Sequence, residues 1–103
     1  MSVIKVSNEN FNSEVISCDK PVLIDFYADW CGPCKMLSPV VDKLAEEHSE
    51  FKVVKVNVDE NPDLAGSYQV MSIPTLVVIE NGKEVNRSMG LQSKQDILNL
   101  VSR

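Results

Sequence analysis

Two cysteines separated by two residues are the side chains of this 103-residue sequence whose type and spacing best suit chemistry. Cys31 and Cys34 lie in the segment WCGPCK, where an apolar stretch gives way to a helical pattern. On a helix, residues i and i+3 share a face with their Cβ atoms about 5–6 Å apart, so a small adjustment lets a disulfide form or open. The spacing therefore predicts a reversible thiol–disulfide pair.

The position of the pair indicates which sulfur is reactive. Cys31 is expected at the N-terminus of the helix, where free backbone N–H groups and the helix dipole stabilise a thiolate and lower the pKa of a thiol. This makes Cys31 the predicted nucleophile. Gly32 leaves no side chain between the sulfurs and an incoming protein, and Pro33 stiffens the first helical turn. Both are expected to tune the redox properties of the pair.

A metal site is the alternative interpretation of the two thiols. Zinc needs four ligands, yet only Cys18 and His48 remain in the sequence, and neither has finger-like spacing. A copper or zinc carrier needs flexible, exposed sulfurs, whereas Pro33 and Trp30 favour a stiff, shielded pair. A C-x-x-C at a strand-to-helix junction indicates redox chemistry instead. We therefore expect no metal site and no bound cofactor, and interpret Cys18 as a reduced, partly buried thiol.

One charged residue interrupts the apolar stretch before the cysteines. Residues 22–28 are apolar on both alternating faces, as in a central buried strand, and Asp25 is their only charge. Burial raises the pKa of a carboxyl group towards the range useful for proton transfer at neutral pH, so Asp25 is a candidate base. Lys55, in the middle of a valine-rich strand, is its candidate counter-charge. A surface aspartate and a solvent-facing lysine are the alternatives.

The elements that position these residues alternate between strand and helix. Helices are predicted to begin at an Asn8 cap, near Met36, at Asn61-Pro62 and at Ser93, and Asn81-Gly82 predicts a hairpin. The strands are predicted at residues 4–6, 22–28, 53–58, 75–79 and 85–89. The order β-α-β-α-β-α-β-β-α predicts an α/β fold with a central mixed, mostly parallel five-stranded sheet flanked by four helices.

Length and composition limit the number of domains, the partners and the compartment that we expect. A chain of this length is expected to form a single domain over residues 1–103. Fifteen acidic against ten basic residues give a net charge of −5, which argues against nucleic acid or an anionic membrane as partner. Three cysteines, an odd number, do not fit a disulfide scaffold. No signal peptide or membrane-spanning stretch is visible, so we expect a cytoplasmic protein.

The segment from Val22 to Met36, VLIDFYADWCGPCKM, resembles the active-site segment of the thioredoxin family. The likeness extends over nearly the whole chain, through Phe11, Lys55-Val56-Asn57-Val58-Asp59, Asn61-Pro62, Ile73-Pro74-Thr75, Asn81-Gly82 and Gly90. It implies the thioredoxin fold and a protein-disulfide reductase: Cys31 attacks a target disulfide, and Cys34, expected to be less exposed, resolves the mixed disulfide. Gly32-Pro33 is the dipeptide of the reducing members.

The resemblance also implies roles for further residues. Asp25 would accept the proton of Cys34, with Lys55 as its charge partner. Pro74 would be a cis proline facing the sulfurs, and the backbone of Ile73 would pair with an extended substrate. The shallow apolar groove that receives the substrate would be framed by Trp30, Met71, Ile73 and Gly90. From the residues alone, Met36, Met71 and Met89 are interpreted as packing residues.

The partners follow from the same resemblance. The family implies many unrelated disulfide-containing target proteins and a recycling thioredoxin reductase, usually a flavoenzyme using NADPH, although some lineages use ferredoxin. The sequence carries no Gly-rich dinucleotide fingerprint, so the electrons must come from another protein. We expect a monomer. A redox-silent interaction subunit is the remaining alternative.

Overall fold

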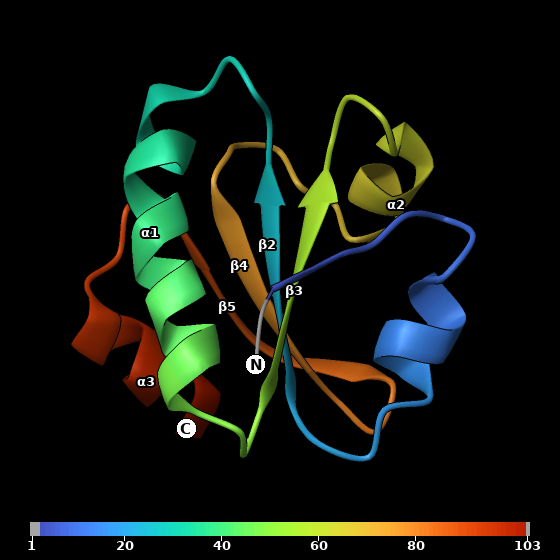
Figure 1. Ribbon diagram of the computed structural model, residues 1–103. Coiled ribbons are helices and arrows are strands. Elements are labelled where there is room, and N and C mark those ends of the chain that lie inside the picture. Colours follow the sequence, from blue (N-terminus) through green and yellow to red (C-terminus); the bar gives the residue numbers. More distant parts are fainter. Residues whose placement is uncertain (1–2, 103) are drawn as a thin grey trace.

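The computed structural model, which describes residues 3–102, alternates strands and helices in the predicted order (Figure 1). The first helical segment, η1, is a single short π-helix. The elements are β1 (Ile4–Lys5), η1 (Asn12–Ile16), β2 (Val22–Tyr27), α1 (Gly32–Glu47), β3 (Lys52–Asn57), α2 (Pro62–Ser67), β4 (Thr75–Glu80), β5 (Lys83–Met89) and α3 (Lys94–Ser102). The predicted α/β fold is therefore confirmed.

The five strands form one mixed sheet in the order β1-β3-β2-β4-β5. β1, β3 and β2 run parallel, whereas β4 pairs antiparallel with both β2 and β5. The pairing of β4 with β5 is interrupted by a bulge between Val78 and Ile79. β2 is a central strand whose two faces are both buried under packed layers, which explains why its apolar run has no polar face.

Helices cover both faces of the sheet (Figure 1). α1 and α3 pack on one face through Leu37, Val41, Leu44 and Ile97, while η1 and α2 lie on the other. Because side chains alternate along a strand, Leu23 faces α1 and Ile24 faces the opposite layer.

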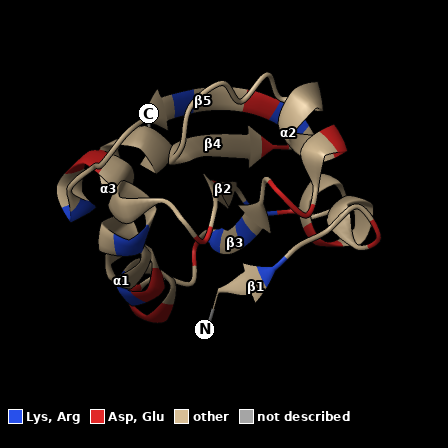
Figure 2. Cartoon of the chain, turned by 90° about the horizontal axis from the view of Figure 1, so that it is seen from above, with Lys and Arg blue, Asp and Glu red and all other residues tan. Residues whose placement is uncertain are grey.

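Seen from above, acidic and basic residues are interspersed over helices and loops (Figure 2). Along residues 3–102, no helix is long and apolar enough to cross a membrane.

The first helical segment differs from its prediction. It begins at Asn12 rather than after an Asn8 cap, and no side chain caps its N-terminus. The N–H of Asn8 instead donates to Oδ1 of Asn61 at 3.3 Å, and Oδ1 of Asn10 accepts the N–H of Ser7 at 2.7 Å. These side-chain contacts hold the preceding residues in a turn, so the helix starts later than the sequence pattern indicates.

Candidate active site

The two cysteines are joined by a disulfide at the junction between β2 and α1, with their Cα atoms 5.2 Å apart. Cys31 is the N-cap residue of α1, and its backbone is extended. Its Sγ accepts a hydrogen bond from the N–H of Cys34 at 3.1 Å. Pro33 lies in the first turn of the helix, where its missing N–H leaves no partner unpaired. The Cys31 sulfur thus lies at the N-terminus of α1, the positive end of the helix dipole.

Burial of the pair differs from the prediction in one respect. Cys34 was expected to be less exposed than Cys31, but each is 4% exposed. In this oxidised state the two residues are equally buried, so the expected difference is absent. They form a small buried cluster with Ala28, against which Tyr27 and Ile73 pack.

Asp25 is a buried carboxyl group with 1% of its surface exposed. It lies two residues after Leu23 on β2 and therefore on the face of the sheet that α1 covers. Among residues 3–102, no group donates a hydrogen bond to either of its carboxylate oxygens. Burial raises the pKa of Asp25 from its ordinary 3.8 to about 6, while the charge of Lys55 lowers it and that of Asp42 raises it. This carboxyl group can therefore change its protonation state near neutral pH.

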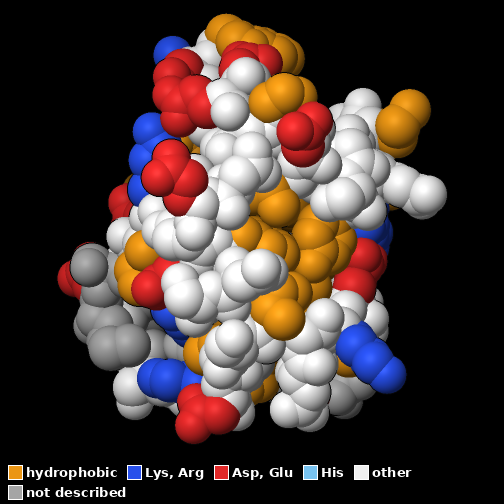
Figure 3. All heavy atoms as spheres, turned by 90° about the vertical axis from the view of Figure 1, so that its right-hand side faces the viewer, with side chains coloured by type: hydrophobic (Ala, Val, Ile, Leu, Met, Phe, Trp, Pro, Cys, Tyr) orange, Lys and Arg blue, Asp and Glu red, His pale blue; other side chains and the backbone are white. Residues whose placement is uncertain are grey.

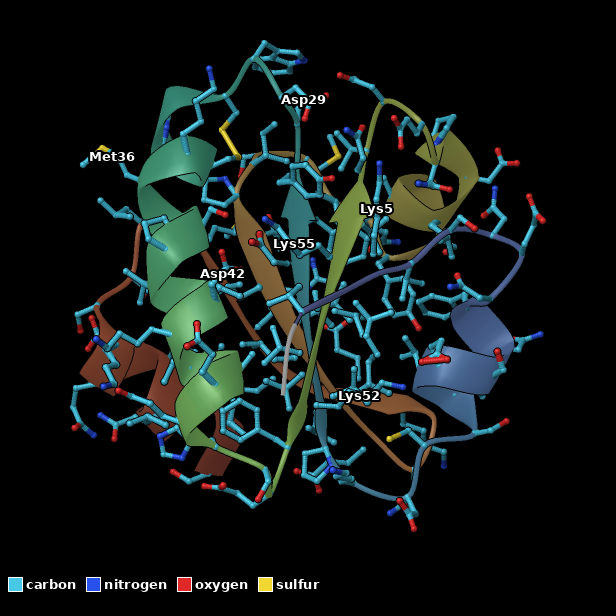
Figure 4. All side chains as sticks on the ribbon, viewed as in Figure 1. Lys5, Asp29, Met36, Asp42, Lys52 and Lys55 are labelled. Carbon is cyan, nitrogen blue, oxygen red and sulfur yellow. A yellow bond between two sulfur atoms is a disulfide. The ribbon has the colours of Figure 1, made fainter. Side chains whose placement is uncertain are left out.

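Lys55 lies opposite Asp25 in the pairing of β3 with β2, on the side that faces α1 (Figure 4). Its Nζ donates to Oγ of Ser38 at 2.8 Å and lies 5.0 Å from the centroid of the Tyr27 ring. Within the described part of the chain, no ion pair of 4.0 Å or shorter joins Lys55 to Asp25. The half-buried Lys55 thus acts on Asp25 through its charge, without direct contact.

A cavity of about 160 Å³ lies beside Cys34, between α1 and the ends of β2 and β3. It is lined by Tyr27, Ala28, Asp29, Cys34, Lys35, Ser38 and Lys55. Cys34 thus shares this cavity with Ser38 and Lys55. Most of the cavity wall is apolar, and Asp29, Lys35, Ser38 and Lys55 are its polar or charged members.

Three of the predicted groove residues line one shallow depression of about 180 Å³, namely Trp30, Met71 and Ile73. Trp30 is 70% and Met71 91% exposed. The Ile73–Pro74 peptide bond is cis, and the O of Pro74 accepts the N–H of Gly90 at 2.8 Å. Figure 3 shows apolar side chains exposed at the end of the molecule where the loop after β2 lies, with acidic side chains beside them. The structure thus brings all five predicted substrate-binding residues to this region.

A further contact fixes the tryptophan and was not predicted from the sequence. Nε1 of Trp30 donates to Oδ2 of Asp59 at 2.8 Å. Asp59 is held in turn, because Oδ1 of the buried Asn57 accepts the N–H groups of Asp59 and Glu60 at 2.9 and 3.1 Å. In the sequence, the only indication of this contact was that the acidic Asp59 comes just after β3. The sheet order, in which β3 lies next to β2, is what places Asp59 beside the cysteine loop.

The interpretation of three methionines as packing residues is wrong. Met36, Met71 and Met89 are 62%, 91% and 60% exposed. Met36 lies near the start of α1, Met71 in the segment before β4 and Met89 at the end of β5. Met36 points away from the sheet on the outer side of α1 (Figure 4), and Met71 and Met89 lie in loop or strand-end positions, so all three side chains remain at the surface.

The remaining predicted residues lie away from the disulfide. Cys18 is a free, half-buried thiol that packs against the core under η1. His48 ends α1, where Nδ1 lies 2.8 Å from Oε2 of Glu50 and the ring stacks on Phe51. Residues 3–102 contain no group of three or more His, Cys, Asp or Glu side chains that could hold a metal ion.

A disulfide that links the N-cap of a helix to its first turn, at the end of a central strand of such a sheet, defines a thiol–disulfide oxidoreductase. The thioredoxin family model matches residues 2–103. Thioredoxin from Porphyra purpurea is 47% identical over 104 residues, covering 100% of this chain and 97% of the relative. Thioredoxins from Chlamydia trachomatis serovar D and Rickettsia felis are 49% and 42% identical, each covering 95% of this chain and 94% of the relative. The chain belongs to the thioredoxin family.

Proposed function

We propose that this protein reduces disulfide bonds in other proteins and receives its electrons from a reductase. The observation that carries the proposal is the disulfide between Cys31 at the N-cap of α1 and Cys34 in its first turn. A bond of this kind opens and closes without rearrangement of the backbone, because both cysteines stay on one helical face.

The first half of the reaction forms a mixed disulfide. The Cys31 thiolate attacks one sulfur of a target disulfide, a bond forms between the two sulfurs, and the target S–S bond breaks. The second target sulfur leaves as a thiolate and takes up a proton. The helix N-terminus stabilises the attacking thiolate, while Gly32 gives the target access and Pro33 keeps the turn rigid.

The second half releases the target. Asp25 accepts the proton of Cys34, the resulting thiolate attacks Sγ of Cys31, and the target leaves with its second sulfur reduced. Two electrons have then passed to the target, and the Cys31–Cys34 disulfide has formed again. Burial gives the Asp25 carboxyl group a pKa of about 6, close to the working pH, and the Lys55 charge limits this increase.

Target binding uses the shallow apolar depression beside the disulfide. Trp30 and Met71 contribute exposed apolar surface, and Ile73, Pro74 and Gly90 present backbone beside it. The backbone of Ile73 pairs with an extended segment of the target. Recognition through backbone and adaptable apolar contacts suits a protein that reduces many unrelated targets.

The recycling partner proposed is a thioredoxin reductase of the flavin- and NADPH-dependent type. No bound cofactor takes part in the proposed reaction, whose redox group is the Cys31–Cys34 disulfide. We place the protein in the cytoplasm, as a monomeric single domain over residues 1–103 that has neither nucleic acid nor membrane as partner. Its net charge of −5 and its free Cys18 support a compartment in which thiols stay reduced.

The Cys34→Ser variant tests the two-step reaction. Without the resolving sulfur, Cys31 should remain bound to the target, so incubation of the reduced variant with an oxidised protein should give a larger species on a non-reducing gel. Dithiothreitol should reduce the mixed disulfide, so that the larger species disappears. The matched control is the Cys31→Ser/Cys34→Ser double variant, which keeps Cys18. Absence of the larger species, or its equal formation by the control, would show that the two-step assignment is wrong.

The two alternative functions predict different outcomes. A metal carrier would purify with about one zinc or copper ion per chain, and the metal would be lost with either cysteine. A redox-silent interaction subunit would keep its partner after both cysteines are replaced by serine. A disulfide reductase should show neither behaviour.

A further inference from the structure

Three polar side chains follow one another along a single face of α1. Cys34, Ser38 and Asp42 are spaced four residues apart, so they lie one above the other. Cys34 is buried, Ser38 is half-buried and Asp42 is exposed. Ser38 therefore stands one turn from the resolving cysteine, and both line the cavity beside it.

The Ser38 hydroxyl fixes the position of the Lys55 ammonium group. Nζ of Lys55 donates to Oγ of Ser38 at 2.8 Å and lies 5.0 Å from the Tyr27 ring centroid. α1, through Ser38, and β2, through Tyr27, thus each contribute one contact to the Lys55 ammonium group. A lysine ammonium on its flexible four-carbon stem has many other positions open to it.

One of those other positions is next to Asp25. The two residues are direct partners in the pairing of β2 with β3, and both point to the α1 side. The Asp25 oxygens accept no hydrogen bond from residues 3–102, so a swing of the Lys55 stem would give the buried carboxylate an ion-pair partner. A direct ion pair favours the charged form of a carboxyl group and makes it a weaker base.

We propose that Ser38 is a positioning residue: its hydroxyl holds Lys55 beside the cavity and short of Asp25, which keeps the carboxyl group free to take the proton of Cys34. This inference rests on the proposed function of the cysteine pair. In this inference, a serine of α1 keeps apart Asp25 and Lys55, two opposite charges that the pairing of β2 with β3 would otherwise allow to meet.

Other ionisable groups lie on the elements around this site. β4 places the apolar Leu76 opposite Asp25, so the charged groups come from the other elements. They are Tyr27 of β2, Asp29 of the following loop, Lys35 and Asp42 of α1, and Lys5 of β1, which pairs with Glu60. Figure 4 shows Asp29, Asp42, Lys5 and Lys55 on these separate elements. Lys55 is the cation whose charge lowers the pKa of Asp25.

The Ser38→Ala variant tests the proposal through the titration of Asp25. The carboxyl ¹³C signal of Asp25, followed by NMR in the reduced protein, should show an apparent pKa about one unit lower than in the wild type. The pH profile for resolution of the mixed disulfide should shift in the same direction, with slower resolution at neutral pH. Ser38→Thr, which keeps the hydroxyl, should restore both. Ser13→Ala, an exposed serine of η1, is the matched control.

A second background separates positioning from a general effect of the serine. In Lys55→Met, the further change Ser38→Ala should leave the Asp25 titration where Lys55→Met alone puts it. An equal shift in both backgrounds, or no shift in Ser38→Ala, would overturn the proposal. The titration needs no target protein. Failure of the proposed function would therefore appear separately, as a missing mixed disulfide in the Cys34→Ser variant.

Discussion

Replacing Cys31 with serine should reduce the dithiothreitol-driven reduction of insulin to the slow rate given by dithiothreitol alone. Serine carries a hydroxyl group that is not ionised at neutral pH and cannot form a sulfur–sulfur bond, so no mixed disulfide forms. The measurement is the turbidity of precipitating insulin B chain, compared between wild type and variant at equal protein concentration. The variant is expected to lose all of the rate increase that the wild-type protein gives over dithiothreitol alone.

The matched control for this experiment is Cys18→Ser. Cys18 is the third cysteine of the chain and packs against the core under η1, on the opposite face of the sheet from α1. Its replacement should therefore leave the rate unchanged. Activity retained by Cys31→Ser would mean that another thiol attacks the target, which would contradict the assignment of the nucleophile.

Replacing Asp25 with asparagine should stabilise the protein at neutral pH. The folded pKa of about 6 lies above the ordinary 3.8, so the folded state holds the proton more tightly than the unfolded state. That contribution is complete below pH 3.8 and is lost as the pH rises through about 6. From the two pKa values, the charged carboxylate costs the folded protein about 3 kcal/mol above this range. Asparagine has nearly the same shape and no charge.

Urea unfolding of the oxidised protein at two pH values measures this effect. The variant and the wild type should have similar free energies of unfolding near pH 4, and the variant should be more stable by about 3 kcal/mol at pH 8. Glu46→Gln, an exposed carboxylate of α1, should give the same small difference at both pH values. A stability difference for Asp25→Asn that does not change with pH would contradict the elevated pKa.

The same variant should slow the second catalytic step and leave the first intact. Without its base, Cys34 loses its proton slowly, so the mixed disulfide with the target should accumulate during turnover. Unchanged turnover of insulin would show that Asp25 is not the proton acceptor. Stability and turnover therefore test two different statements about one residue, its burial and its role.

The sequence predicted the features that depend on local pattern. The valine-rich run predicted a strand at residues 53–58, which corresponds to β3 (Lys52–Asn57), and the apolar run of β2 predicted a central strand. The cysteine spacing predicted a disulfide because both residues lie on one helical turn. In each case the deciding contacts are between residues close in the chain or on one strand.

Features that depend on the arrangement of separate elements were not predictable in the same way. The exposure of Met71 depends on how the segment before β4 is placed in the fold, which its apolar side chain does not reveal. Ser38 is unremarkable as a serine within a helix, and only the position of Lys55 on a neighbouring strand gives it a partner. Its spacing of four residues from Cys34 was the one available signal.

The two edge strands of the sheet, β1 and β5, determine whether another molecule could add a strand to it. β1 pairs with β3 at only Ile4 and Lys5, and the outer strand β5 carries Lys83, Glu84 and Arg87 and lies next to a bulge. Short, charged and bulged edge strands disfavour the addition of a strand from another molecule. Both edges of the sheet are therefore poorly suited to pairing with a strand of another copy of the chain.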